Sequence, residues 1–189
     1  MTMPAPDTII THTGPVFRVE STVVVDRTGR AMRRDVVRHP GAVTVIPVLA
    51  DGRVAVIRNM RIAVNERLIE FCAGKLEPGE DPQAAAAREL EEECGFRAGT
   101  ITRLGMFYTS PGFTDERMHV FLATQLSEVP QRLEPGEEID VELVSVAALR
   151  SWIRDGSLRD GKSIAAFALW LALCQGKEEG RGMEVPQAW

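Results

Sequence analysis

Residues 74–96 (GKLEPGEDPQAAAARELEEECGF) constrain the fold of this chain more than any other stretch. Asp81 and Pro82 predict a helix start, because an Asp side chain accepts hydrogen bonds from free amide groups and Pro at the first helical position loses none. The alanine and glutamate residues that follow are strong helix formers, and Gly95 is suited to the position that ends a helix. We therefore predict one helix between Asp81 and Gly95.

The predicted helix carries a crowded acidic face. Residues three and four positions apart share a helix face, so Glu89, Glu92 and Glu93 project together. The apolar stripe expected to face the core consists of Ala86, Leu90 and Cys94. A solvated acidic face is the ordinary alternative, but these acids lie in the C-terminal half of the helix, where its dipole disfavours negative charge. Because carboxylate oxygens suit Mg²⁺ or Mn²⁺, the pattern favours a metal site.

Composition limits the classes of protein to which the chain can belong. Its 189 residues suffice for one domain with a sizeable core, and two full domains would be cramped. A net charge of −5 leaves no broad basic surface for nucleic acid or for a membrane. The first residues do not resemble a secretion signal, and no apolar run approaches the length of a transmembrane helix. Three cysteines without paired spacing indicate reduced thiols in a cytoplasmic setting.

The rest of the chain is predicted to be rich in strands, with further helices at its end. Strands are predicted over residues 16–26, 31–38, 42–49, 53–59, 67–71, 100–108, 117–123 and 140–146. Further helices are predicted over residues 146–155 and 160–175. The first two strands form an N-terminal hairpin, and residues 50–52 are expected to form a hairpin turn between the next two. Residues 1–13 are expected to be a loose leader and residues 127–139 an exposed loop. This order predicts an α/β fold, an α/β/α sandwich with a mixed sheet.

Three segments follow from this division. Residues 1–40 are the leader and hairpin, residues 41–178 the main domain, and residues 179–189 a flexible tail that could also serve in a dimer contact.

The box pattern G-x5-E-x7-R-E-(apolar)-x-E-E-x-G-(apolar) in residues 74–96 resembles the Nudix hydrolase family at every position. Three flanking segments, IRNMR (57–61), LIEFCAGKLEPGE (68–80) and YTSPGFTDE (108–116), resemble the bacterial ADP-ribose pyrophosphatase subgroup, in which a proline follows the box glycine at the distance of Pro111 from Gly95. The resemblance covers about residues 15–175. One departure is Cys72, where the family usually has proline before Ala73 and Gly74.

The resemblance implies a fold, a reaction and an assembly. The fold would be a Nudix-type α/β/α sandwich with an N-terminal hairpin used in dimerisation. The reaction would be hydrolysis of the ADP-ribose diphosphate to AMP and ribose 5-phosphate, with two to three Mg²⁺ or Mn²⁺ ions per site. A homodimer would share each site between subunits. The alternatives are hydrolysis of another nucleoside diphosphate sugar, such as GDP-mannose or ADP-glucose, and a non-catalytic module that senses ADP-ribose.

Roles near the metal also follow from the resemblance. The expected metal ligands are the backbone carbonyl of Ala73 and the side chains of Glu89, Glu92, Glu93 and Glu137. Gly74, Glu80 and Arg88 would hold these ligands in place, and Arg88 would also count among the catalytic residues. The catalytic base would be Glu137, with Glu138 a close second and Glu92 or Glu93 as the alternative. Simple solvation of the loop is an equal alternative for Glu137 and Glu138.

Substrate contacts complete the expectations. Arg61 would bind a phosphate or the terminal ribose, because a guanidinium group donates two parallel hydrogen bonds to such oxygens. The ribose pocket would be lined by Glu77, Ser110, Gly112 and Glu116. Arg33 and Asp35 on the hairpin would reach the adenine, and a solvated strand is the alternative for both.

Overall fold

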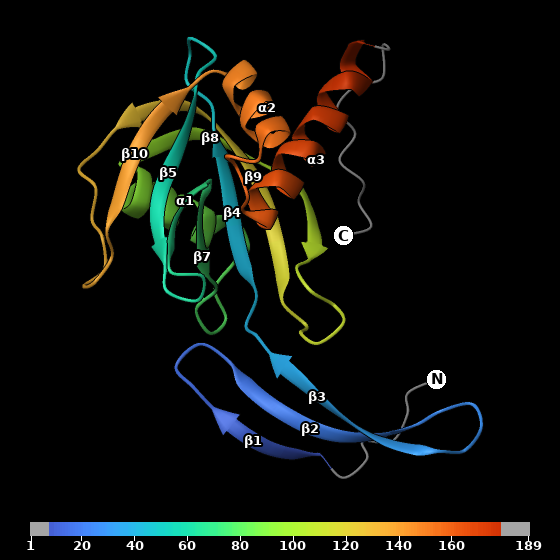
Figure 1. Cartoon of the computed structure of the whole chain (residues 1–189). Coiled ribbons are helices and arrows are strands. Elements are labelled where there is room, and N and C mark those ends of the chain that lie inside the picture. Colours follow the sequence, from blue (N-terminus) through green and yellow to red (C-terminus); the bar gives the residue numbers. More distant parts are fainter. Residues whose placement is uncertain (1–7, 179–189) are drawn as a thin grey trace.

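The computed structural model describes residues 8–178, in which seven strands precede one helix, three more strands follow it and two helices come last (Figure 1). The strands are β1 (Ile9–Thr13), β2 (Arg18–Val25), β3 (Ala31–Arg38), β4 (Ala42–Pro47), β5 (Val54–Arg61), β6 (Glu66–Glu70), β7 (Cys72–Lys75), β8 (Phe96–Tyr108), β9 (Arg117–Glu128) and β10 (Ile139–Val144). The helices are α1 (Pro82–Cys94), α2 (Val146–Asp155) and α3 (Gly161–Glu178).

The predicted α/β fold with a mixed sheet is confirmed. Strands pair in the order β7-β4-β9-β8, and β4 runs parallel to β9 while the other neighbours are antiparallel. A second sheet has the order β10-β5-β6, and both of its pairings are antiparallel. Helix α1 covers one side of the strands, and α2 and α3 cover the other (Figure 1).

Strands β4 and β5 are buried on both faces because helices pack on each side of them. Val43 and Val45 of β4 lie in the cluster that contains α1, whereas Ile46 lies in the cluster that contains α2 and α3. Since side chains alternate between the two faces of a strand, these near-continuous apolar runs supply two cores at once.

Helix α1 begins and ends where the sequence predicts. The Asp81 carboxylate accepts hydrogen bonds from the amides of Gln83 (2.9 Å) and Ala84 (3.1 Å), which satisfies free donors of the first turn. Gly95 ends the helix in the left-handed conformation, with φ of 66°, where glycine avoids the strain of a side chain. The predicted apolar stripe of Ala86, Leu90 and Cys94 is buried.

The structure departs from the local expectations in three places. Residues 9–13 of the expected leader form strand β1, which pairs with β2 to make a three-stranded N-terminal sheet. Cys72–Lys75 forms strand β7 against β4, although its residues have low strand propensity. Strands β4 and β5 meet only at the bridge between Val48 and Val54, beside the turn, and then enter different sheets.

The N-terminal sheet of β1, β2 and β3 projects away from the rest of the fold (Figure 1). Its connection to the main body runs through the end of β3. Arg38 forms an ion pair with Asp115 (3.1 Å), and the Val37 amide donates to the carbonyl of Phe113 (2.8 Å). The expected flexible tail, residues 179–189, lies outside the described residues, as do residues 1–7 of the expected leader. Within residues 8–178, none of the helices combines the length and apolarity that crossing a lipid bilayer requires.

Candidate active site

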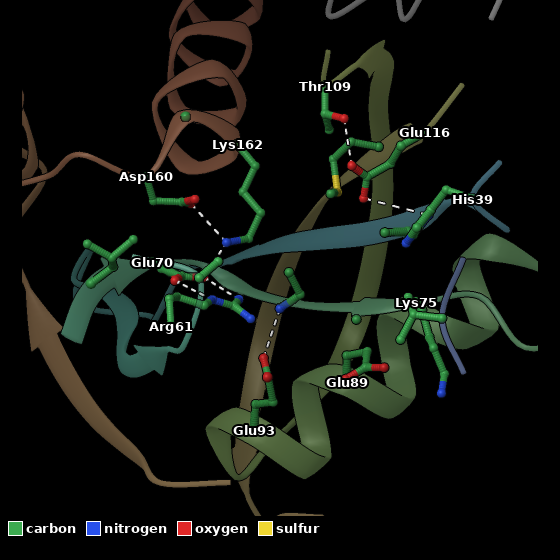
Figure 2. Close-up of a pocket in the computed structure, with 18 of the residues that line it drawn as sticks. His39, Arg61, Glu70, Lys75, Glu89, Glu93, Thr109, Glu116, Asp160 and Lys162 are labelled. Carbon is green, nitrogen blue, oxygen red and sulfur yellow. Dashed lines mark hydrogen bonds and ion pairs between the residues drawn. The ribbon is translucent and has the colours of Figure 1, made fainter. Parts of the chain in front are cut away.

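The acidic face of α1 forms one wall of a cavity of about 760 Å³. The opposite parts of the wall come from β5, β6, β7, the start of α3 and the segment between β8 and β9 (Figure 2). The predicted site residues that line it are Arg61, Ala73, Gly74, Glu77, Arg88, Glu89, Glu92, Glu93, Ser110, Glu116 and Glu137. Side chains far apart in the sequence therefore share one concave space.

Glu93 is held deep in this wall. It is 4% exposed, and its Oε2 accepts a hydrogen bond from the Ala73 amide at 2.8 Å (Figure 2). Burial raises the pKa of Glu93 to about 8, and the negative charge of Glu89 acts in the same direction. Such a carboxyl is unfavourable as an anion unless a positive charge lies beside it.

Glu89 lies one helical turn before Glu93 and packs against the backbone of Gly74. A Cβ atom added at Gly74 would lie 1.8 Å from Glu89 Oε1, so only glycine leaves room for this carboxylate. Burial raises the pKa of Glu89, and the nearby Arg88 guanidinium opposes this shift. Glu89 therefore depends on a close approach between α1 and β7.

Arg88 ties the acidic residues together. Its Nη1 donates to Glu89 (2.6 Å) and to Glu92 (3.0 Å). Its Nε and Nη2 donate to the two oxygens of Glu80 at 3.0 and 3.1 Å. Glu80 does not line the cavity, but it fixes the guanidinium from behind and also accepts a hydrogen bond from the Glu77 amide (2.9 Å).

The carboxylates of α1 fit a hard divalent cation by their chemistry. All of them offer oxygen ligands, and burial of Glu89 and Glu93 raises the pKa of both, a cost that a bound cation would remove. Across the part of the chain that the structure describes, no three His, Cys, Asp or Glu side chains are grouped tightly enough to form a finished metal site. Instead, Arg88 and the Ala73 amide hold the carboxylates.

Glu137 reaches the cavity from the loop between β9 and β10. Its Oε2 accepts a hydrogen bond from the Glu134 amide at 2.8 Å, so the loop itself orients the carboxylate. After burial, the negative charge of Glu137 is a further cause of the raised pKa of Glu89 and of Glu93. The acidic loop therefore faces the acidic helix. Glu138 does not line the cavity, and its backbone carbonyl accepts a hydrogen bond from Arg67.

The end of the cavity near β9 is built around Glu116. Its Oε2 accepts a hydrogen bond from the Thr109 hydroxyl at 2.6 Å, and its Oε1 lies 3.7 Å from His39 Nδ1 (Figure 2). Ser110 lines the cavity beside them, whereas Gly112 does not. Arg33 and Asp35 lie on β3 outside the cavity, and Arg33 donates to Ser21 (3.4 Å).

Sequence reasoning missed a second charged group at the other end. Glu70, Asp160 and Lys162 line the cavity around Arg61, and Figure 2 shows the four side chains turned toward one another. Two signals for them are visible in hindsight: Glu70 is an acid inside the apolar strand pattern RLIEF, and Lys162 is a cation at the start of a strongly apolar helix. Neither signal reveals that the two residues meet.

Comparisons with known proteins show which sequences and structures this chain is similar to. A family model described as NUDIX domain matches residues 38–167. The chain is 45% identical over 118 residues to the ADP-ribose pyrophosphatase of Bacillus subtilis (strain 168), a match that covers 62% of this chain and 64% of that relative. It is 35% identical over 155 residues to the methanol dehydrogenase activator of Bacillus methanolicus, covering 81% and 84% of the two chains.

A solved structure shares the fold. The crystal structure of an ADP compounds hydrolase superposes with a TM-score of 0.75 at 24% identity, covering 96% of this chain and 99% of that one. At this identity the likeness concerns the architecture of the chain.

Proposed function

The chain belongs to the NUDIX domain family, and on that premise we propose that it hydrolyses the diphosphate of ADP-ribose to AMP and ribose 5-phosphate. The observation that carries the proposal is the pair of buried carboxylates, Glu89 and Glu93, on one wall of a cavity that also contains Arg61. Arg88 pairs with Glu89 at 2.6 Å, whereas Glu93 is buried against the Ala73 amide. Burying a second acid beside the first costs stability, so the pair indicates a cationic ligand.

When bound, a divalent cation (Mg²⁺ or Mn²⁺) would neutralise charge on the diphosphate and lower the pKa of a water molecule. In our proposal Glu89, Glu92, Glu93 and the Ala73 carbonyl hold two to three such ions. Arg88 positions the carboxylates through its hydrogen bonds, and Glu80 in turn positions Arg88. Gly74 provides the space for Glu89.

We assign the catalytic base to Glu137. It lines the cavity opposite the α1 carboxylates, whereas Glu138 does not line it. Glu92 or Glu93 remains the alternative base, because both lie on the same cavity wall. The substrate contacts that we propose are Arg61 with a phosphate and Glu77, Ser110 and Glu116 with ribose hydroxyls, with Gly112 in the adjoining turn.

The direct test is an assay with ADP-ribose and Mg²⁺. Residues that only support a metal ligand typically contribute about 10–100-fold to metal affinity or activity. Replacing a ligand itself, in Glu93→Gln, is therefore expected to lower kcat/KM more than about a hundredfold. Glu91→Gln is the matched control, because Glu91 lies on the same helix outside the cavity and pairs with Arg97 at 2.7 Å. Full activity of Glu93→Gln would contradict the metal assignment.

The same assay separates the alternatives. Wild-type protein that leaves ADP-ribose intact but cleaves GDP-mannose or ADP-glucose would replace the proposed substrate. Binding of ADP-ribose without cleavage of any of these compounds would indicate a sensing module.

We also propose that the N-terminal sheet contacts a second copy of the chain, so that Arg33 and Asp35 reach the adenine site of the partner. In support, the sheet projects from the main body and exposes Ile9 and Ile10, which are 52% and 62% accessible (Figure 1). Sedimentation equilibrium is expected to give a dimer, and Ile10→Lys should weaken it because the lysine charge would have to be desolvated. A monomeric wild-type protein would refute this arrangement.

The three free thiols also support a reducing, cytoplasmic setting.

A further inference from the structure

The carboxylate of Glu70 is completely buried in the cavity wall and is paired with two cations. Arg61 donates to it through Nε (2.7 Å) and Nη2 (2.6 Å), in the two-pronged geometry that a guanidinium favours. The Lys162 ammonium donates to the same carboxylate from the start of α3. Figure 2 shows this group on one side of the cavity, with Glu93 below it.

Lys162 is itself held firmly. Besides Glu70, it donates to Asp160 at 2.9 Å, and Asp160 also accepts from the Ser163 amide at 3.0 Å in the first turn of α3. The Lys162 side chain is only 12% exposed, and it lines the cavity. An ammonium group has three donors, so two carboxylate partners leave one donor for a ligand.

A second ion pair joins β6 to the segment just before α3 and gives an internal comparison. Arg159, three residues before Lys162, pairs with Glu66, which lies four residues before Glu70. Both partners are exposed, and neither lines the cavity. The exposed pair needs no explanation beyond solvation.

The buried pair of Lys162 and Glu70 does need a further explanation. Desolvation of charged side chains is expensive, and a buried ion pair is frequently no more stable than apolar residues of the same volume. Arg61 and Lys162 line the same cavity as the acidic wall. The Arg61 charge lowers the pKa of Glu93, although burial raises it by more. Arg61 and Lys162 are therefore placed at the border of the site where the metal-bound diphosphate would lie.

We propose that Lys162 is a substrate-binding residue which, together with Arg61, holds phosphate oxygens of the diphosphate, and that Glu70 positions both cations. This inference rests on the proposed function. The acidic wall would hold the diphosphate through bound metal ions, while Arg61 and Lys162 would hold it by direct hydrogen bonds. Glu70 does not touch the substrate: it fixes the side-chain conformations of two long cations that would otherwise lose entropy on binding.

The first experiment compares Lys162→Met and Lys162→Arg with the matched control Arg159→Met in ADP-ribose kinetics at saturating Mg²⁺. Loss of one charge-assisted hydrogen bond should raise KM about tenfold or more in Lys162→Met, with kcat changed by less than about threefold. Lys162→Arg should restore most of the affinity, and Arg159→Met should match the wild type. Glu70→Gln should raise KM in the same direction.

The second experiment measures equilibrium binding of ADP-ribose by calorimetry in EDTA, where turnover is stopped. Weaker binding by Lys162→Met than by Arg159→Met supports the inference even if the wild type cleaves no ADP-ribose, a result that would refute the proposed function alone. Normal cleavage with equal KM and equal affinity in both variants overturns the inference and leaves the proposed function intact. Should Lys162→Met fail to fold in thermal unfolding, Lys162→Gln carries the same expectation.

Discussion

The two sides of strands β4 and β5 have different cores. Toward α1, nearly half of the buried residues are Ala or Cys, namely Ala55, Cys72, Ala85, Ala86, Cys94 and Ala123. Toward α2 and α3 they are larger, including Ile46, Phe71, Leu104, Leu149 and Phe167. The side that faces α1 thus contains more small side chains than the side that faces α2 and α3.

The difference separates the site from the main source of stability. Small side chains let α1 lie close enough to β7 for Glu89 to touch the Gly74 backbone and for Glu93 to meet the Ala73 amide. Burying a large apolar side chain stabilises a fold by about 1.5–3 kcal/mol, so the α2 and α3 side contributes more per residue. The buried acids therefore depend on close packing of α1 against β7, whereas the other side is filled with large apolar side chains.

The largest expected effect concerns Glu93 in the metal-free protein. Its pKa rises from 4.5 to about 8 on folding, so between these pH values the folded carboxyl keeps a proton that the unfolded one releases. The contribution to stability is therefore complete below pH 4.5 and is lost as pH rises to about 8, by about 1.4 kcal/mol per pH unit. Glu93→Gln lacks this dependence.

Denaturant unfolding in EDTA at about pH 5 and about pH 8 measures this pH dependence of the unfolding free energy. The difference in unfolding free energy between wild type and Glu93→Gln isolates the contribution of Glu93. Identical pH dependence in the two proteins would show that Glu93 is not buried as an acid, and the contrast between the two sides would lose its main support.

The next effect concerns the bulky side. Phe167 is 2% exposed and packs edge-on against Trp170, with ring centroids 5.9 Å apart, so Phe167→Ala should cost about 3–5 kcal/mol of unfolding free energy. Its kcat/KM should stay at the wild-type value where the variant is folded.

Leu90→Ala on the α1 side should lower the unfolding free energy by about 2–5 kcal/mol. It should also lower kcat/KM, because Leu90 anchors the helix that carries the acids. Equal losses of kcat/KM in Phe167→Ala and Leu90→Ala would show that the two sides of the strands support the site equally.

The smallest effect on stability is expected for Gly74→Ala. The new Cβ would displace the Glu89 carboxylate, which lies 1.8 Å from its position, but the end of a flexible side chain can move. We expect the unfolding free energy to change by less than about 1 kcal/mol, while the apparent Mg²⁺ affinity falls about 10–100-fold. Activity measured against Mg²⁺ concentration tests this, and an unchanged affinity would mean that Glu89 does not need its position beside Gly74.

The local structure of helix α1 follows from the amino-acid sequence. Asp81 and Gly95 set the ends of α1, and the helical period placed Glu89, Glu92 and Glu93 on one face, because caps and periodicity act over a few residues. The same reasoning located most strands from alternation and turns. It failed for β7, since Cys72–Lys75 becomes a strand only through its pairing with β4.

The residues that meet the acidic face of α1 depend on long-range packing. Gly74 and Ala73 receive Glu89 and Glu93 because β7 lies under α1, and Lys162 meets Glu70 across 92 positions of sequence. Burial raised the pKa of Glu93, which no count of charges along the chain predicts, because desolvation depends on the packing around the group. The spacing of the carboxylates is a property of the helix, whereas their burial and their partners are properties of the fold.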